Sequence, residues 1–255
     1  MSAPLRIVAL VPAAGLGVRM AGGRSAKGAA PPKQLLELDG VPILFWTLRR
    51  LAAGKRIERL IVAVRPGDQA AVEARGKKEE YAARLTVVAG GESRQESVAK
   101  ALEKVPAGAD LVLVHDAVRP FVEAAVIERV IEAAAQTGAA IVALPATDTV
   151  KQVEPFMPSV QGKPAGGGRQ SRITATIPRE RIVLAQTPQV FRTALLKEAM
   201  AAAEKDGFRA SDEAGLVERL GHAVTVVMGS ERNIKITTPA DLELARLLLA
   251  REKSH

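Results

Sequence analysis

The sequence predicts an α/β fold with a mostly parallel sheet, helices on both faces and a protruding β-arm. Two observations lead to this prediction. Between residues 5 and 144, short apolar runs alternate with segments of helical periodicity. Strands separated by helices need crossover connections, which produce a parallel sheet covered on both sides. A Pro- and Gly-rich stretch then interrupts the alternation once, after which it resumes. This pattern is typical of a Rossmann-like sheet.

The predicted strands are short apolar runs with the length and composition of buried strands. In chain order they are Leu5–Val11, Leu60–Val64, Leu85–Ala89, Leu111–Val114, Ala139–Leu144, Ile182–Leu184 and Ala223–Val227.

The predicted helices lie between these strands, and some carry specific signals. Leu44, Leu48 and Leu51 recur at helical spacing. Ser93 and Glu96 are spaced as a capping box. Thr238 is placed as an N-cap, with a proline at the first helical position. The helices are Pro42–Ala53, Gly67–Ala83, Ser93–Lys104, Glu123–Gln136, Thr193–Lys205, Asp212–Leu220 and a last one opened by Thr238.

The arm is predicted at about residues 149–178. Two β-prone segments, Thr149–Val153 and Ile173–Ile177, flank a stretch rich in proline and glycine, Pro155–Gly168. This punctuation favours a hairpin-like arm with a loose tip, and a flexible surface loop is the alternative. We expect residues 1–255 to form a single domain from which the arm projects.

The composition favours a small anionic ligand. The chain has 255 residues, of which 47% are hydrophobic, and carries a net charge of +8 with three histidines and no cysteine. Disulfides and thiolate metal sites are therefore excluded, and a cytoplasmic location is expected. Only 3% of the residues are aromatic, which supplies few stacking platforms for nucleic acid. No apolar run is long enough to span a membrane, and the segment before the first strand is too short for a signal peptide.

A phosphate site is predicted in the segment from Ile7 to Gln34. Its strand opens into the small residues Ala13, Ala14, Gly15 and Gly17, followed by the cations Arg19, Arg24, Lys27 and Lys33. Small side chains let backbone amides approach an anion, and cations neutralise the remaining charge. Met20 replaces the third glycine of a dinucleotide-binding loop, and no Gly-Lys-Ser/Thr follows. The segment is therefore neither of those two standard loops.

Three other segments are candidates, two of them because ligands bind beyond the carboxyl ends of parallel strands. Gly90–Ser97 could receive a flat ligand against its paired glycines, or could be an ordinary capped turn. Asp116 is a natural Mg²⁺ ligand beside phosphates, and Arg119 could hold a second phosphate. The alternative is an Asp116–Arg119 turn pair, and His115 is expected to be structural. Lys235 is predicted on a short strand, where a lysine is usually solvated.

Seven motifs together carry a resemblance to a known family. They are PAAGLGVRM at 12–20, PKQ at 32–34, GGESRQESV at 90–98, HDAVRP at 115–120, DT at 148–149, TPQVF at 187–191 and NIKITTPADL at 233–242. In order and number they resemble the 2-C-methyl-D-erythritol 4-phosphate cytidylyltransferases of the non-mevalonate isoprenoid pathway. The resemblance runs over nearly the whole chain.

The resemblance implies a nucleotidyltransferase that joins CTP to methylerythritol phosphate, giving 4-diphosphocytidyl-2-C-methyl-D-erythritol and diphosphate, with Mg²⁺ or another hard divalent cation. It implies that the arm helps to complete the site of a partner in a homodimer, with no nucleic acid or membrane partner. The rival readings are another polyol-phosphate cytidylyltransferase, acting for instance on ribitol 5-phosphate, and a basic nucleic-acid-binding protein. A fused second enzyme of the pathway is not expected at this length.

The resemblance also assigns roles to individual residues. Arg19 and Lys33 would be catalytic, stabilising charge on the triphosphate, and Asp116 would bind or orient the metal. CTP would lie against Ala13, Ala14, Gly15, Gly17, Gly91, Glu92 and Ser97. The substrate-positioning residues would be Arg179, Lys235, Arg119 and Thr149, with Arg172 and Arg181 as alternatives to Arg179.

Overall fold

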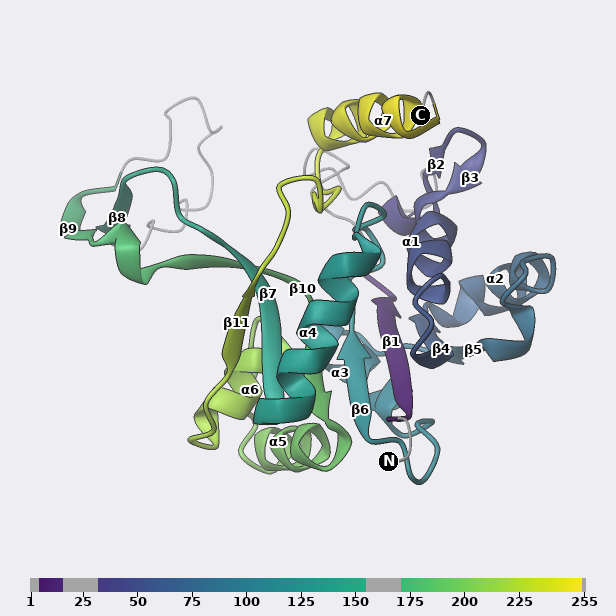
Figure 1. Ribbon diagram of the computed structural model, residues 1–255, viewed down its shortest axis with the longest axis horizontal. Helices are drawn as coiled ribbons and strands as arrows, with labels where there is room; N and C mark the ends of the chain where they lie inside the picture. The colour runs from purple at the N-terminus through teal and green to yellow at the C-terminus, as the bar shows by residue number, and fades with distance from the viewer. Residues whose placement is uncertain (1–4, 16–31, 155–170, 254–255) are drawn as a thin grey trace, which may run out of the picture.

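The structure is a computed structural model that describes residues 5–15, 32–154 and 171–253. Its centre is a sheet of seven strands in the order β11-β7-β10-β6-β1-β4-β5 (Figure 1). The strands are β1 (Ile7–Ala13), β4 (Ile57–Val64), β5 (Leu85–Ala89), β6 (Leu111–Val114), β7 (Ala139–Pro145), β10 (Val183–Arg192) and β11 (Thr225–Met228). Within the described ranges, no helix is both long and apolar enough to cross a membrane.

The sheet is mostly parallel, as predicted. β1 pairs in parallel with β4 and β6, β4 with β5, and β7 with β11. β10 runs antiparallel to both of its neighbours, β6 and β7. It therefore joins two parallel parts of the sheet that would otherwise not be hydrogen-bonded to each other.

Helices cover both faces of the sheet, which confirms the predicted layers. They are α1 (Ile43–Ala52), α2 (Gln69–Gly76), α3 (Arg94–Leu102), α4 (Ala124–Thr137), α5 (Thr193–Lys205), α6 (Glu213–Arg219) and α7 (Pro239–Lys253). Alternate residues of β1 divide between the two faces. Ile7 and Ala9 pack in one core cluster with α1, α2 and α4, whereas Val8 and Leu10 pack in another with α3, α5 and α6.

A third, smaller cluster lies at one end of the sheet. There α7 packs with the hairpin of β2 (Glu37–Leu38) and β3 (Val41–Pro42), and Figure 1 shows the helix lying across that end. Asp39 and Gly40 at the hairpin turn both have positive φ, 54° and 71°. Asp-Gly is a strong signal for a two-residue hairpin turn, so this short hairpin, which was not predicted, was detectable in the sequence.

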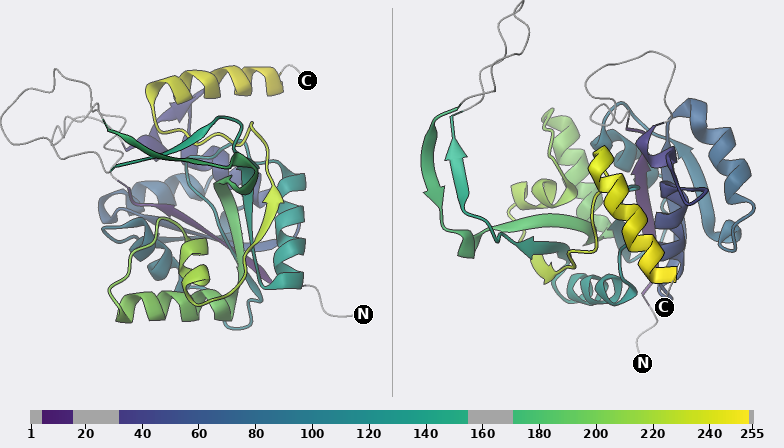
Figure 2. Two further views of the ribbon diagram at one scale, coloured as in Figure 1. Left: turned by 90° about the vertical axis from the view of Figure 1, so that its left-hand side faces the viewer. Right: turned by 90° about the horizontal axis from the view of Figure 1, so that it is seen from above.

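The predicted arm is present as a separate pair of antiparallel strands. β8 (Val150–Val153) pairs with β9 (Ile173–Ile177), with Val150 opposite Ile177. Figure 2 shows this ribbon extending away from the main sheet. The predicted tip, Pro155–Gly168, lies outside the described residues, which resume at 171.

Three sequence predictions need correction. The helix predicted over Gly67–Ala83 is regular only over Gln69–Gly76, because Gly76 is a poor helix former. There a Cβ would lie 2.4 Å from Leu85 Cδ2. The strand predicted at Ile182–Leu184 continues to Arg192. Its polar residues Gln186, Thr187 and Gln189 are buried in the sheet, although their polarity suggested a loop. Lys235 lies in a segment without regular strand structure.

Candidate active site

The candidate site lies where β1, β5 and β6 end. The loop after β1, the turn from β5 to α3 and the segment after β6 line a cavity of about 200 Å³, together with residues from two more distant segments. The lining residues are Pro12, Ala13, Ala14, Gly15, Lys33, Gln34, Gly91, Glu92, Ser93, Arg94, Ser97, Asp116, Ala117, Val118 and Lys235. Most of the predicted site residues in the described ranges are therefore brought together, at the sheet edge where parallel folds bind ligands.

Gln34 holds the loop after β1 in place. The residue is 3% exposed, and its Nε2 donates to the carbonyl oxygens of Ala13, at 2.5 Å, and Gly15, at 3.2 Å. The PKQ motif is thereby fixed beside the small-residue loop, and Lys33 is placed on the cavity wall. Gly17 and Arg19, predicted to bind and activate CTP, fall in the segment 16–31, outside the described residues.

The turn between β5 and α3 is shaped by its own packing. A Cβ on Gly90 would lie 2.5 Å from Ala14 Cβ, and one on Gly91 would lie 2.3 Å from Glu96 Cβ. Both positions thus require glycine. The paired glycines let the turn pack against the β1 loop, and Gly91 also lies on the cavity wall.

The predicted capping interaction is present at the start of α3. Ser93 Oγ accepts from the backbone N–H of Glu96 at 3.1 Å, which satisfies one free amide of the first turn. The carboxylate of Glu96 accepts from the N–H of Glu92, one residue earlier than in a standard capping box. Ser97 Oγ donates to the Ser93 carbonyl and accepts from the Gly91 N–H. The hydroxyl of Ser97 therefore supports the turn that lines the cavity.

Asp116, just after β6, is held between cations. Its Oδ1 lies 3.1 Å from Arg94 Nε, its Oδ2 lies 2.8 Å from Lys235 Nζ, and Arg119 Nε is 3.7 Å away. Burial alone would raise the pKa of Asp116, but the charges of these three cations outweigh it and hold the pKa well below the ordinary value. Asp116 is therefore ionised across the physiological pH range.

Arg94 and Glu213 are the functional candidates that sequence reasoning missed. Nη1 of Arg94 lies 2.7 and 2.8 Å from the two carboxylate oxygens of Glu213, the first residue of α6. Glu213 is 1% exposed. Burial opposes the charged form of both residues, and it raises the pKa of Glu213, whereas the two carboxylates raise the pKa of Arg94 above its ordinary value. The one sequence signal was a cation at the first position of α3, where the helix dipole disfavours it.

His115 is structural, as predicted. Its Nε2 lies 3.1 Å from the carbonyl oxygen of Arg119, which can only accept, so Nε2 carries the proton. Its Nδ1 then accepts from Thr187 Oγ1 at 3.0 Å, and that hydroxyl in turn accepts from the N–H of Asp116. Burial lowers the pKa of His115 to about 4. The neutral ring thus ties β10 to the segment that carries Asp116.

Arg119 is mainly bound within the fold. Its side chain is buried and donates to the carbonyl oxygen of Asn233 at 2.6 Å, besides the long contact to Asp116. Ile236 N–H donates to the Val118 carbonyl. These bonds fix the NIKIT segment against the HDAVRP segment and place Lys235 at the cavity. The contacts of Arg119 therefore fit the turn-pair alternative better than the role of a free phosphate ligand.

Thr149 and Arg179 lie at the base of the arm, not on the cavity wall. Both are exposed, and Arg179 Nη1 donates to the Thr147 carbonyl at 2.8 Å. Of the two alternatives to Arg179, Arg181 lies in the same short 3₁₀ turn and Arg172 lies just before β9. These predicted substrate-positioning residues are therefore not brought to the cavity by their own chain.

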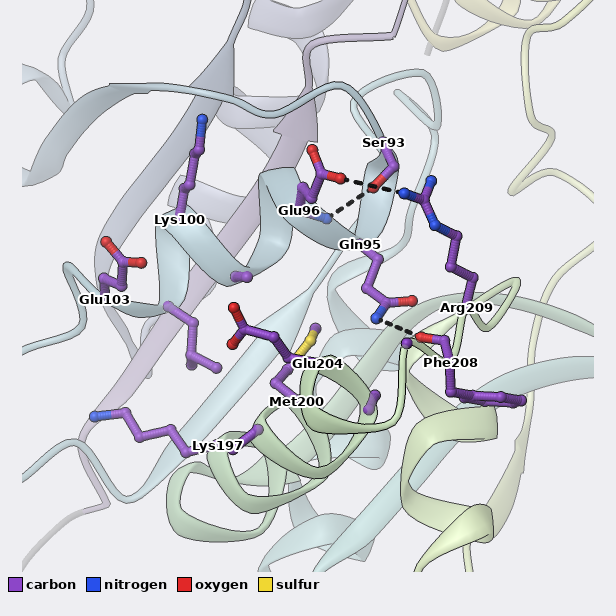
Figure 3. Close-up of a pocket in the computed structure, with 15 residues that line it drawn as sticks. Ser93, Gln95, Glu96, Lys100, Glu103, Lys197, Met200, Glu204, Phe208 and Arg209 are labelled. Atoms are coloured by element: carbon purple, nitrogen blue, oxygen red, sulfur yellow. Dashed lines mark hydrogen bonds and ion pairs between the residues drawn. The ribbon is translucent and has the colours of Figure 1, made fainter.

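A larger hollow of about 790 Å³ lies on the other side of α3, between α3 and α5 (Figure 3). Its wall combines charged residues such as Lys100, Glu103 and Glu204 with apolar ones such as Met200. Ser93 is the residue that it shares with the wall of the candidate site. None of the predicted phosphate-binding cations is among its lining residues, so the smaller cavity is the candidate site.

The described residues do not fit a preformed magnesium site. No group of three or more His, Cys, Asp or Glu that could hold a metal occurs among them. Both oxygens of the Asp116 carboxylate are already bonded to cations. A divalent ion at Asp116 would have to share this carboxylate with Arg94 and Lys235.

Residues 7–251 match the family described as 2-C-methyl-D-erythritol 4-phosphate cytidylyltransferase. Proteins of that name from Acidobacterium capsulatum and Solibacter usitatus are 53% and 48% identical, over 98% and 97% of this chain and 100% and 97% of their own length.

Solved structures agree with the sequence matches. The enzyme of that name from Thermus thermophilus is 36% identical with a TM-score of 0.71, covering 96% of this chain and 100% of that one. The 4-diphosphocytidyl-2C-methyl-D-erythritol synthase from Anaerococcus prevotii is 27% identical with a TM-score of 0.79, covering 97% and 100%. The motifs that resemble this family line one cavity at the ends of the strands. Together with the matches over nearly the whole length, this shows that the chain belongs to the 2-C-methyl-D-erythritol 4-phosphate cytidylyltransferase family.

Proposed function

We propose that this protein transfers the cytidylyl group of CTP to 2-C-methyl-D-erythritol 4-phosphate, releasing diphosphate, through residues that line the cavity at the ends of β1, β5 and β6. The observation that carries the proposal is the convergence there of a small-residue loop, Lys33 and Lys235 around a space of about 200 Å³. Membership of the family supports the reaction and its place in isoprenoid synthesis.

The proposed reaction needs little proton transfer by the protein. The second pKa of a phosphate monoester is about 6, so the phosphate of the acceptor is already anionic at neutral pH. It attacks the α-phosphorus of CTP in line, and diphosphate leaves. What the enzyme must supply is alignment of the two phosphates and stabilisation of charge on the α-phosphate and the leaving group. The buried, neutral and fully bonded His115 fits a mechanism without a general base.

The triphosphate is proposed to bind on the β1 side of the cavity. The backbone of Ala13, Ala14 and Gly15 approaches it, and Lys33 neutralises the charge that develops. Gly17 and Arg19 share these roles by their place in the same motif. Gly91, Glu92 and Ser97 form the β5–α3 wall, against which cytosine and ribose are proposed to lie.

The phosphate of the acceptor is proposed to bind at Lys235, which also lines the cavity. Arg119 acts there by fixing the NIKIT segment, through its bond to Asn233. Thr149 and Arg179 are exposed at the arm base of the same chain, so we propose that they serve the site of a second copy in a homodimer. The exposed apolar residues of the arm, such as Ile173, 59% exposed, support an interface on the arm.

The remaining proposals concern the metal and the compartment. We propose that Mg²⁺ enters with the triphosphate, because Mg²⁺ is usually held by phosphate oxygens and one or two carboxylates, and that Asp116 is the carboxylate nearest to it. The absence of cysteine fits a reducing compartment, and we propose the cytoplasm.

The test is diphosphate release from CTP and Mg²⁺ with methylerythritol phosphate and ribitol 5-phosphate offered separately. Release with the first alone is expected. Release with ribitol 5-phosphate alone would keep the triphosphate assignments and overturn the acceptor. No release with either acceptor, together with salt-sensitive binding to DNA or RNA, would favour the rival reading of a nucleic-acid-binding protein.

A further inference from the structure

Glu213 is a buried carboxylate that the proposed mechanism does not use. It begins α6, and no residue of α6 is among those lining the candidate site. It does not touch the cavity, but its oxygens lie 2.7 and 2.8 Å from Arg94, which lines it. Arg94 lies at the first position of α3, after the N-cap Ser93. One carboxylate on α6 thus reaches the site through one guanidinium on α3.

Fold stability does not explain this arrangement. A helix N-terminus favours anions, so Glu213 suits its place on α6, but Arg94 is on the unfavourable end of α3. Taking charges out of water costs free energy that an ion pair often fails to recover, and apolar replacements of buried pairs are frequently neutral or stabilising. The side chain of Arg94 nevertheless keeps 29% exposure, as expected if part of it must face a ligand.

The guanidinium of Arg94 is a rigid fork between two carboxylates. Nη1 contacts Glu213, while Nε lies 3.1 Å from Oδ1 of Asp116. Because the fork is planar, fixing its Nη1 end fixes the direction from which Nε approaches Asp116. The other oxygen of Asp116 then holds Lys235 Nζ at 2.8 Å. The contacts form an unbroken series from Glu213 through Arg94 and Asp116 to Lys235.

We propose that Glu213 is a positioning residue for the cytidylyl transfer: it sets the orientation of Arg94, and through Arg94 and Asp116 it sets the place of the Lys235 ammonium in the cavity. The proposal deepens the proposed function, on which its kinetic part rests. Without the carboxylate of Glu213, Arg94 is free to turn both ends of its fork to Asp116. The Asp116 carboxylate then rotates, and the Lys235 ammonium loses its contact with Oδ2 of Asp116. A misplacement of about 1 Å at a reacting phosphate can cost up to about 100-fold in rate.

The test compares Glu213→Gln with a matched control, Glu79→Gln. Glu79 also bonds an arginine through both oxygens, Arg49 at 2.8 and 3.0 Å, and its side chain is 6% exposed. It lies between α2 and β5 and does not line the candidate site. Both variants lose a buried carboxylate–arginine pair, so a general loss of stability affects both. We expect kcat to fall about 10- to 100-fold in Glu213→Gln and to stay near the parent value in Glu79→Gln.

A double variant separates positioning from mere stability. If Glu213 acts through Lys235, then Glu213→Gln adds little to the loss of kcat already caused by Lys235→Met, because residues that act as a unit are not additive. Independent, multiplicative losses would overturn the proposal. So would equal kcat losses in Glu213→Gln and Glu79→Gln. Should Glu213→Gln not fold, Glu213→Asp keeps the charge but retracts it by one methylene, and a kcat unchanged in that folded variant would equally overturn it.

A second readout needs no turnover and keeps the proposal apart from the proposed function. Trace acylation with acetic anhydride, followed by peptide mass spectrometry, measures how accessible the Lys235 amine is. We expect Lys235 to react several-fold faster in Glu213→Gln than in the parent, and equally in Glu79→Gln and the parent. An unchanged reactivity of Lys235 in Glu213→Gln would overturn the positioning role. A parent enzyme without turnover would overturn the proposed function but leave this labelling result to decide the role of Glu213.

Discussion

The side chain of Gln34 donates from one nitrogen to the carbonyl oxygens of both Ala13 and Gly15. It connects two motifs that are separated by the segment 16–31 in the sequence. The loop after β1 and the PKQ motif therefore form one unit at the cavity.

Gln34→Met should weaken the use of CTP and destabilise the fold moderately. The methionine keeps the volume but leaves the buried Ala13 carbonyl without this donor, at a cost of about 1–3 kcal/mol. We expect a Tm lower by a few degrees and a several-fold higher KM for CTP, measured by thermal unfolding and diphosphate release. Gln69→Met, at the start of α2 and remote from the cavity, is the control. An unchanged KM for CTP would show that the loop does not depend on Gln34.

Lys33→Ala should lose most of kcat while the protein stays folded. Lys33 lies on the cavity wall beside the β1 loop, where its charge is proposed to stabilise the triphosphate in the transition state. Removing one such stabilising group typically costs about 10²- to 10³-fold in kcat. Lys55→Ala, in an exposed turn before β4, should have no effect. Near-normal turnover by folded Lys33→Ala would remove Lys33 from the mechanism.

Stability should fall as the pH is lowered from 6.5 to about 4. Burial keeps His115 neutral down to about pH 4 in the folded chain, whereas its ordinary pKa is 6.5. Between these values the unfolded chain binds more protons, so the contribution of His115 is complete above pH 6.5 and is lost as the pH falls, by about 3 kcal/mol at most.

The variant His115→Gln isolates this effect. Denaturant unfolding of both proteins from pH 7 to pH 4 should show a shallower loss of stability in the variant. Asp116 and Glu213 titrate in both proteins and largely cancel in the difference. Parallel curves over this range would mean that His115 is protonated as easily in the folded chain as in the unfolded one.

Deleting residues 158–167 should leave the main fold intact. The deletion lies between β8 and β9, which belong to a separate two-stranded sheet. If the arm completes the site of a second copy, the deletion raises the KM for the acceptor or weakens the dimer, which sedimentation and kinetics would measure. An unchanged sedimenting mass together with an unchanged KM for the acceptor would show that residues 158–167 have no role in the dimer or the site.

Sequence patterns predicted the elements that depend on local apolar runs. β5, β6, β9 and α5 have the predicted bounds. β10 was shortened in the prediction because Gln186, Thr187 and Gln189 interrupt the apolar pattern. Each is buried and bonded to a side chain far away in the sequence, such as Asn233 or His115, and partners of this kind are not visible in a local pattern.

The sequence also predicted the location of part of the candidate site. Asp116, Lys235 and Gly91 follow from motifs at the ends of segments, and the cavity contains them all. Arg94 and Glu213 were missed because 119 positions separate them in the sequence. Their contact is nevertheless part of the series that runs through Asp116 to Lys235. An ion pair between two helix N-termini depends on how the helices pack on the sheet, which residue types and spacings do not specify.

The antiparallel strand β10 has a consequence for how the chain folds. During synthesis, β6 and β7 appear well before residues 183–192, so each has an unpaired edge until β10 is inserted between them. Such long-range pairing is slow, and exposed edges invite association with other chains. Thr187, which anchors Asp116 and His115, arrives with the same strand. Alignment of the site is therefore a late event, and a nascent chain that ends before β10 carries the loops without the strand that orders them.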